Sequence, residues 1–241
     1  AVQSLDERAV VTGGGVGISA TAGCMMNSEG VLSTGMTTSH GIGIQVTLDV
    51  DGELTSSYQG ASSRSKLEDV PDCVGRAVHW AQVTQNPLNV KSEAVDAPVL
   101  MTSEGFSPLF SMVVPPAMTG EKMVRKESFW AEHLGEQVIN PALSIRDDGL
   151  LEGGMSSGSR DAEGVPRQQR TLVDQGRLCG MLWSTRDAAQ QVAEGRIEAA
   201  ASTGSASSGG HQSPPTTGCT ELFLTSTEAP RSMDQLLEHM G

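Results

Sequence analysis

A strict alternation of apolar and polar residues between residues 42 and 49 constrains the fold more than any other feature of this sequence. Its apolar members are Ile42, Ile44, Val46 and Leu48. A period of two places every second side chain on the same face of a strand, so this segment predicts a half-buried strand. The Asp51-Gly52 dipeptide that follows is typical of a tight hairpin turn. Together these signals predict an antiparallel meander over residues 31–60.

The apolar period changes to that of a helix between residues 67 and 84. The residues that recur at helical spacing are Leu67, Val70, Val74, Ala77, Val78 and Ala81. An apolar stripe of this kind predicts an amphipathic helix that packs on the meander. Pro87 ends the helix, and the stretch between Pro87 and Pro98 has few large apolar side chains. We therefore expect one domain over residues 1–90 and a second over residues 91–241.

The second half of the chain shows both helical and β-type signals. A strand is predicted at residues 99–102. The helical segments that follow are expected to kink or break at Pro115-Pro116, because proline lacks a backbone N–H. Further strands are predicted at residues 143–145, 171–174, 178–183 and 221–225, and a helix at residues 233–240. The expected fold class is α+β, with antiparallel-dominated sheets, packed helices and two part-domains.

Charge and cysteine content narrow the classes of partner. The chain has 29 acidic and 16 basic residues and a net charge of −13. Such a balance repels nucleic-acid phosphates and anionic lipid, so we expect no nucleic-acid partner and no membrane partner. The four cysteines are scattered without a CxxC pair, which favours buried free thiols. No apolar stretch approaches the ~20 residues that span a bilayer, so a soluble, cytoplasmic protein is expected.

Histidine and carboxylate spacings give little support for a catalytic or metal centre within this chain. Glu132-His133 is a carboxylate–imidazole neighbour pair, but it has no second histidine one helical turn away. A hydrolase that uses Glu132, His133 and other ligands stays open as an alternative. Residues 15–20 fit a loose GxGxxA dinucleotide pattern, but β-type signals follow them. A glycine-rich strand is therefore the better interpretation.

The stretch from residue 143 to residue 178 contains several unusual elements in a fixed order. Asp147-Asp148 leads into a glycine-rich turn, which is followed by a D-x-E-G-x-P element at residues 161–166 and then by Arg170 and Gly176. This order resembles the signature of the TldD/PmbA family. Further matching segments lie at residues 27–30, 125–126, 134–138 and 202–206. The resemblance extends over nearly the whole chain.

The resemblance implies a PmbA/TldE-like member without a metal site of its own. The TldD-type members carry His-Glu-x-x-x-His on a helix, and Ser111, Met112 and Pro116 stand at these motif positions here. No catalytic residue, metal ligand or cofactor is therefore expected in this chain. Zinc is expected in a TldD-like partner subunit of a heterodimeric protease. The implied chamber holds an extended or unfolded peptide as an added β-strand.

The resemblance also points to residues that would form or support the chamber wall. They are Arg160, Asp161, Glu163, Gly164 and Arg170. The alternative is that they are turn caps and hairpin ion pairs. By the same resemblance, residues 1–90 are the C-terminal part of the family's N-terminal α/β domain, and residues 91–241 are the first part of its β-rich C-terminal domain. A shortened or fragmentary member is expected, and a stand-alone β-rich binding or structural module is the remaining alternative.

Overall fold

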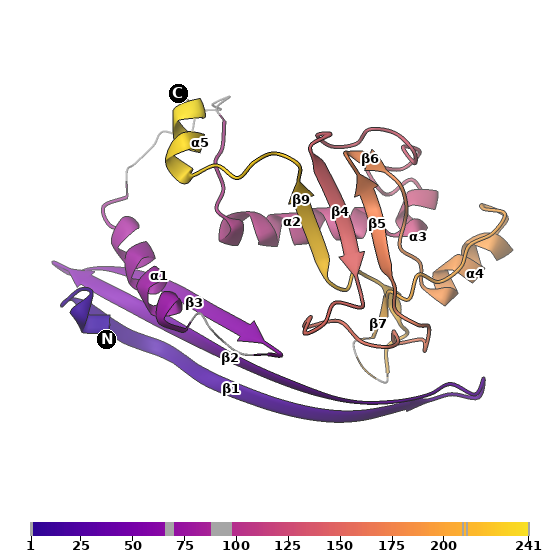
Figure 1. Cartoon of the computed structure of the whole chain (residues 1–241), viewed down its shortest axis with the longest axis horizontal. Helices are drawn as coiled ribbons and strands as arrows, with labels where there is room; N and C mark the ends of the chain where they lie inside the picture. Colours follow the sequence, from indigo (N-terminus) through magenta and orange to yellow (C-terminus); the bar gives the residue numbers. More distant parts are fainter. Residues whose placement is uncertain (1, 66–69, 88–97, 209, 211, 241) are drawn as a thin grey trace. The chain divides into compact units, whose positions relative to one another are not determined.

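A computed structural model of the chain describes residues 2–65, 70–87, 98–208, 210 and 212–240. The chain divides into two compact units. The first consists of Ala1–Cys24 and Thr34–Val95, and the second of Met25–Ser33 and Asp96–Gly241. The described elements of each unit combine helices with antiparallel strand pairs (Figure 1), which confirms the predicted α+β class.

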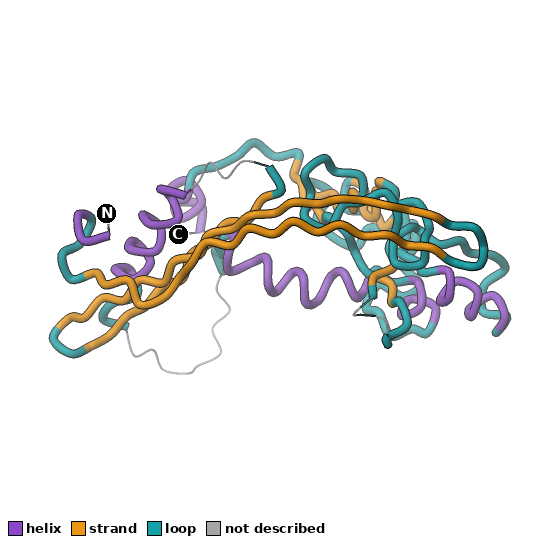
Figure 2. The backbone as a smooth tube through the Cα atoms, turned by 90° about the horizontal axis from the view of Figure 1, so that it is seen from below, coloured by secondary structure: helices purple, strands orange, loops and turns teal. Residues whose placement is uncertain are grey.

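The first unit contains a three-stranded sheet with the order β1-β2-β3. Its strands are β1 (Ala9–Met26), β2 (Leu32–Val50) and β3 (Glu53–Ser63), and Figure 2 shows β1 and β2 as two long neighbouring strands. β2 and β3 pair antiparallel from Val50↔Glu53 to His40↔Ser63. The turn between them has positive φ at both Asp51 and Gly52 (54° and 89°), as a type I′ hairpin requires. The meander predicted from this dipeptide is confirmed.

Helix α1 (Val70–Val83) supplies the other half of the first unit's core. Buried side chains of β2 pack against buried side chains of α1. The core members are Val2, Ala9, Val46, Leu48, Ala77, Val78 and Ala81. Thr55 of β3 also donates a hydrogen bond from Oγ1 to the carbonyl oxygen of Ala81, at 2.7 Å. The predicted packing of this helix on the meander is therefore confirmed.

The glycine-rich segment at residues 15–20 lies inside β1. A dinucleotide site would need a helix to begin directly after these glycines, whereas β1 continues to Met26. The interpretation of this segment as a strand is confirmed.

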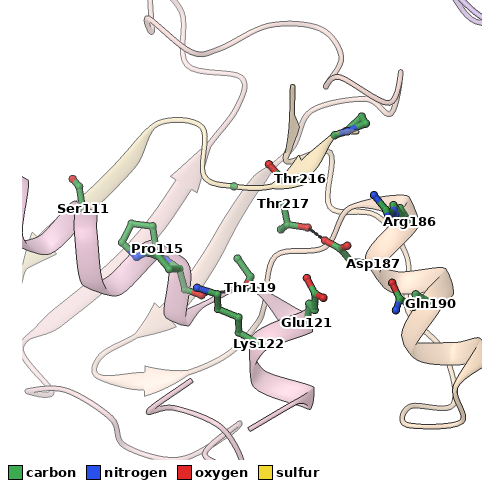
Figure 3. A pocket seen from close by; sticks show the side chains of 13 residues that line it. Ser111, Pro115, Thr119, Glu121, Lys122, Arg186, Asp187, Gln190, Thr216 and Thr217 are labelled. Carbon is green, nitrogen blue, oxygen red and sulfur yellow. Dashed lines mark hydrogen bonds between the residues drawn. The ribbon is translucent and has the colours of Figure 1, made fainter. Parts of the chain in front are cut away.

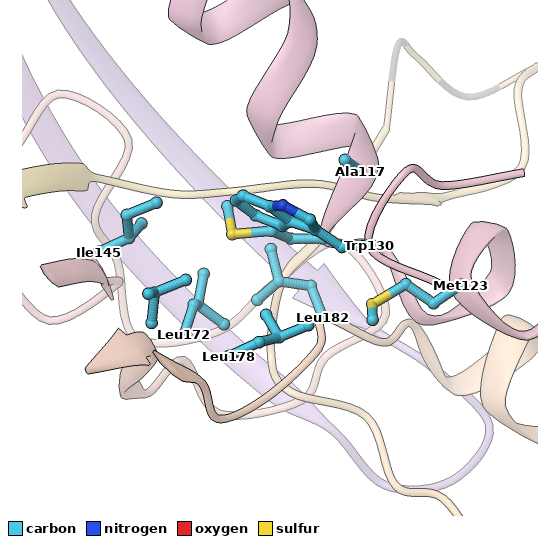
Figure 4. Close-up of a cluster of buried hydrophobic side chains, with 9 residues drawn as sticks. Ala117, Met123, Trp130, Ile145, Leu172, Leu178 and Leu182 are labelled. Carbon is cyan, nitrogen blue, oxygen red and sulfur yellow. The ribbon is translucent and has the colours of Figure 1, made fainter. Parts of the chain in front are cut away.

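The second unit is built around a four-stranded sheet with the order β6-β5-β4-β9. Its strands are β4 (Leu143–Asp148), β5 (Gln169–Asp174), β6 (Arg177–Leu178) and β9 (Leu222–Ser226), and all neighbouring pairs are antiparallel. Three of the predicted strand positions are thus occupied by β4, β5 and β9. Apolar side chains of the sheet gather around Trp130 to form the core (Figure 4). The buried members are Ala117, Met118, Met123, Trp130, Ile145, Leu172, Val173, Leu178 and Leu182.

The remaining elements of the second unit are helices and two short strands. They are α2 (Ser103–Ala117), α3 (Gly120–Val124), α4 (Thr185–Ala193), α5 (Met233–Met240), β7 (Ala206–Ser207) and β8 (Thr216–Thr217). The predicted C-terminal helix is confirmed by α5. Among the helices of the described residues, none has the length and apolar character that a membrane span requires.

Two local predictions in the second unit are wrong, and a third is slightly displaced. Residues 99–102 form no strand; Thr102 instead caps α2, and its Oγ1 accepts the Gly105 N–H at 3.2 Å. The predicted interruption of the helical segments lies slightly further along the chain, because Pro115 and Pro116 form the last turn of α2, which ends at Ala117. The strand predicted at residues 178–183 is limited to β6.

Candidate functional site

A cavity of about 430 Å³ lies in the second unit, where α2 ends and α3, α4 and β8 meet (Figure 3). Both apolar proline rings and charged side chains line it. Its lining consists of Ser111, Pro115, Pro116, Thr119, Glu121, Lys122, Arg186, Asp187, Gln190, Pro215, Thr216, Thr217 and Gly218. This volume is in the range of small-ligand sites in proteins.

The end of α2 forms one wall of the cavity. Proline at positions 115 and 116 cannot donate backbone hydrogen bonds, and the chain turns out of the helix directly afterwards. The backbone N–H of Met118 donates to the Pro115 carbonyl at 3.2 Å, and the Ser128 hydroxyl donates to the Ala117 carbonyl at 2.7 Å. Met118 is completely buried in the core. The turn is therefore anchored on one side, while Ser111, Pro115 and Pro116 line the cavity.

The first turn of α4 forms a second wall. The Ser184 side chain caps this helix by accepting the Asp187 N–H at 3.0 Å. The Asp187 carboxylate accepts a hydrogen bond of 2.5 Å from the Thr217 hydroxyl of β8, which Figure 3 marks with a dashed line. The same hydroxyl oxygen accepts the Ser184 N–H at 2.8 Å. This network joins α4 to β8 and fixes the direction of the Asp187 side chain.

Asp161, one of the predicted residues, organises the turn that precedes β5. Its carboxylate is buried and accepts three backbone N–H groups, from Glu163 at 3.0 Å, Val165 at 2.9 Å and Ala206 at 3.0 Å. The bond to Ala206 joins the D-x-E-G-x-P element to the segment at residues 202–206. Two segments that carried the family resemblance are thus in direct contact.

Glu163 connects the same turn to the cavity. Its carboxylate accepts the N–H groups of Thr185 at 2.6 Å and Arg186 at 3.3 Å. Both donors belong to the first turn of α4, where a negative charge also interacts favourably with the helix dipole. Glu163 does not line the cavity, but it holds the helix that does.

The other predicted residues also lie outside the cavity lining. Gly164 has φ of +84°, and a Cβ atom there would lie 3.1 Å from Cγ1 of Val31, so both backbone and space favour glycine. Arg160 donates from Nη1 to the Gly164 carbonyl at 2.7 Å. Arg170 lies opposite Asp147 in the sheet and donates from Nη2 to Gln168 at 2.5 Å. The structure brings Arg160, Asp161, Glu163 and Gly164 together in one turn, and their role in a substrate chamber stays a prediction.

Burial changes the chemistry of Asp147, near the end of the inner strand β4, and of Cys219. Asp147 is 2% exposed, and burial raises the pKa of its carboxyl above the ordinary value, although two hydrogen bonds from Thr220 oppose the change. Burial, with a smaller contribution from the charge of Asp147, raises the pKa of the Cys219 thiol to about 12. The thiol is therefore protonated at neutral pH and is a poor nucleophile. The prediction of buried thiols is wrong for Cys24 and Cys179, which are exposed.

Glu132 and His133, the pair considered for a hydrolase, have separate partners. The Glu132 carboxylate forms an ion pair with Lys126 at 2.7 Å, which lowers the pKa of Glu132. His133 contacts Glu136 through Nδ1, also at 2.7 Å. All four side chains are largely exposed. This arrangement gives no convergent site and does not favour the alternative hydrolase.

Sequence reasoning missed most of the cavity lining. The missed charged and amide side chains are Glu121, Lys122, Arg186, Asp187 and Gln190. One signal was present, because Ser184 followed three residues later by Asp187 is typical of a helix N-terminus. That signal could have located α4, but no local pattern shows that α3 lies beside it.

A family model described as the PmbA/TldA metallopeptidase C-terminal domain matches residues 94–241, more than half of the chain. The chain belongs to the PmbA/TldD family. The match covers the cavity, the D-x-E-G-x-P turn and the core sheet of the second unit. It confirms the family that the order of motifs indicated.

Similar proteins agree with this family over different lengths of the chain. An uncharacterized protein of Methanocaldococcus jannaschii is 28% identical over 237 residues, which are 98% of this chain and 53% of that protein. The metalloprotease PmbA of Escherichia coli O157:H7 is 28% identical over 164 residues, or 67% of this chain and 36% of that protein. The crystal structure of TldE from Thermococcus kodakarensis aligns with a TM-score of 0.80 at 22% identity, covering 99% of this chain and 52% of that one. This chain therefore spans about half the length of these relatives or less.

The cavity residues do not fit the zinc ion that a metallopeptidase family implies. Zinc is held by imidazole, thiolate or carboxylate groups, most often four in all or three with a water. The segment 111–116 offers a hydroxyl, a thioether and two proline rings. Of the two lining carboxylates, Glu121 is paired with Arg125 at 3.1 Å and Asp187 is bonded to Thr217. In the part of the chain that the structure describes, no three His, Cys, Asp or Glu side chains form a metal-holding group.

Proposed function

We propose that this chain acts as a PmbA/TldE-like subunit of a TldD/TldE-type metalloprotease complex that cleaves extended or unfolded peptides. In this proposal the zinc and the water-activating carboxylate belong to a TldD-like partner subunit. The present chain completes the peptide-binding chamber and performs no hydrolysis by itself. The complex is expected in the cytoplasm, and the four free cysteines support a reducing compartment.

The observation that carries the proposal is the chemistry of the α2 end. Residues 111–116 stand where the family resemblance places the metal-binding motif, and three of them line the cavity. Metal hydrolysis needs a cation that lowers the pKa of water and a base that takes its proton. Ser111, Pro115 and Pro116 supply neither of these. In this proposal, the segment at the motif position forms a cavity wall and carries no catalytic groups.

A peptidase assay with reconstituted subunits tests the proposal. The chain alone, with added zinc, is expected to cleave unfolded peptides negligibly. Addition of a TldD-like protein that carries His-Glu-x-x-x-His is expected to give zinc-dependent cleavage that exceeds the cleavage by the partner alone. The control is a partner whose motif glutamate is replaced by glutamine, which should remain inactive in the mixture.

The Ser111→His/Met112→Glu double variant tests whether the absence of these two motif side chains is by itself the reason that the chain does not hydrolyse peptides. It should remain inactive alone, because Pro116 still takes the place of the second imidazole. Substantial zinc-dependent turnover by the unmodified chain alone, or one equivalent of zinc after extensive dialysis, would contradict the proposal.

A further inference from the structure

The charged groups of the cavity differ in whether they have partners. Its carboxylates are engaged, Glu121 by Arg125 and Asp187 by Thr217. Its two cationic side chains, Lys122 of α3 and Arg186 of α4, have no ion pair or side-chain hydrogen bond with any other described residue. A hydroxyl does not neutralise a carboxylate, so two unpaired positive charges remain against the one negative charge of Asp187. The excess charge of the cavity lining is therefore positive.

This positive charge is unusual in a chain with a net charge of −13. Acidic residues are abundant, and most described basic side chains form an ion pair or a hydrogen bond within the chain. Examples are Arg8 with Asp6 at 2.7 Å, Lys126 with Glu132 at 2.7 Å and Arg196 with Glu194 at 2.6 Å. Lys122 and Arg186 are among the few that do not, and both line the same cavity. They extend from different walls, α3 and α4 (Figure 3).

We propose that this cavity binds a peptide through a carboxylate, with Lys122 and Arg186 supplying the opposing charge; the inference rests on the proposed peptide-handling role. A singly charged carboxylate fits better than a phosphate, since the neighbouring Glu121 and Asp187 oppose a higher negative charge. The rings of Pro115, Pro116 and Pro215 offer apolar contact to the carbon chain beside the carboxylate. The carboxylate is either the C-terminus of the peptide or an Asp or Glu side chain.

Calorimetric titration of the whole chain with short unfolded peptides tests the inference without a partner subunit and without catalysis. Three peptides of equal length are compared. The first has neutral side chains and a free C-terminus, the second is amidated and contains Asp and Glu, and the third is amidated with Asn and Gln instead. At least one of the first two should bind several times more tightly than the third, and raised salt should weaken that binding. The stronger of the two identifies the source of the carboxylate.

Charge-matched variants show whether the cavity is the site. Lys122→Met and Arg186→Gln should each weaken the binding of the preferred peptide about fivefold, as expected for one exposed ion pair. Their combination should bring its affinity to that of the neutral amide. The control, Lys126→Met/Arg231→Gln, removes the same total charge from two ion-paired residues outside the lining and should bind as the unmodified chain does.

The inference is overturned if the neutral amide binds as well as the acidic peptides, or if the control variant loses as much affinity as the cavity variant. Because binding is measured on this chain alone, a failure of partner-dependent cleavage leaves the result interpretable. Conversely, the chain could bind peptides equally well with and without a carboxylate and still complete an active complex. That result would overturn this inference and leave the proposed function intact.

Discussion

Asp147 lies at the end of β4, almost completely buried, and its Oδ1 accepts hydrogen bonds from the Thr220 N–H at 2.7 Å and from the Thr220 hydroxyl at 2.8 Å. Its neighbour Asp148 accepts hydrogen bonds from Leu150 and Gln169 instead. In the sequence the two are an ordinary carboxylate pair. Their different environments follow from the partners that β5 and residues 219–221 supply, and those contacts join positions far apart in the chain.

The raised pKa of Asp147 gives its stability contribution a definite pH dependence. The folded state holds the Asp147 proton more tightly than the unfolded chain does. The stability that the protonated Asp147 carboxyl contributes is therefore lost as the pH rises from the pKa of the unfolded chain through the pKa of the folded chain. Asn at this position cannot titrate, so Asp147→Asn should gain stability relative to the unmodified chain as the pH increases across that window.

Urea denaturation at several pH values between about 4 and 7 measures this difference. Asp174→Asn, at an exposed position of β5, controls for the chemical change. A difference in the free energy of unfolding between Asp147→Asn and the unmodified chain that stays constant with pH would contradict the prediction.

Helix α4 shows which elements the sequence could predict and which it could not. The β2–β3 hairpin and α1 have strong local signals, namely a two-residue alternation, an Asp-Gly turn and a helical apolar stripe. α4 is short, with Ala188 and Gln191 as its buried residues. Its first turn is hydrogen-bonded to Glu163 and Thr217, which lie far away in the sequence. The site was missed for the same reason, since its walls converge only in the folded chain. Of the residues proposed for it, Glu163 touches α4 but lies outside the cavity.

The Glu163→Ala substitution tests how far this carboxylate holds α4. Two N–H groups of the first turn lose their acceptor, and a favourable charge at the helix N-terminus is removed. We expect the free energy of unfolding to fall by about 1 kcal/mol, together with faster hydrogen exchange at residues 185–188. Glu152→Ala, which removes an exposed acidic residue of the same unit, is the control. Equal effects of the two substitutions would show that Glu163 has no special role in α4.

At the scale of the whole molecule, the two units enclose separate cores. One core contains Leu48 of β2, and the other contains Leu172 of β5; both side chains are at most 1% exposed. The apolar periodicity predicted the first core well, because a single strand and a single helix contribute most of it. The second combines residues of α2, α3 and several short strands, and no continuous pattern in the sequence indicates that combination.

Leu48→Ala and Leu172→Ala should each destabilise mainly the unit that contains the substitution. A Leu→Ala change in a packed core costs about 2–5 kcal/mol. Hydrogen exchange followed by mass spectrometry should therefore accelerate in α1, β2 and β3 for Leu48→Ala, and in β4, β5 and β9 for Leu172→Ala. Each variant is the control for the other. Uniform acceleration over both units in either variant would show that the two cores unfold as one.

Strand β1 affects how this chain behaves in concentrated solution. Its 18 residues include no charged residue and no proline, and within the described residues it pairs only with β2. Natural edge strands usually carry lysine, proline or a bulge that prevents pairing with a second molecule. β1 contains neither lysine nor proline, and its Ile18 is 85% exposed. We therefore expect the purified chain to associate with itself through β1 at high concentration. Ile18→Lys would introduce the kind of charge that natural edge strands use to prevent such pairing.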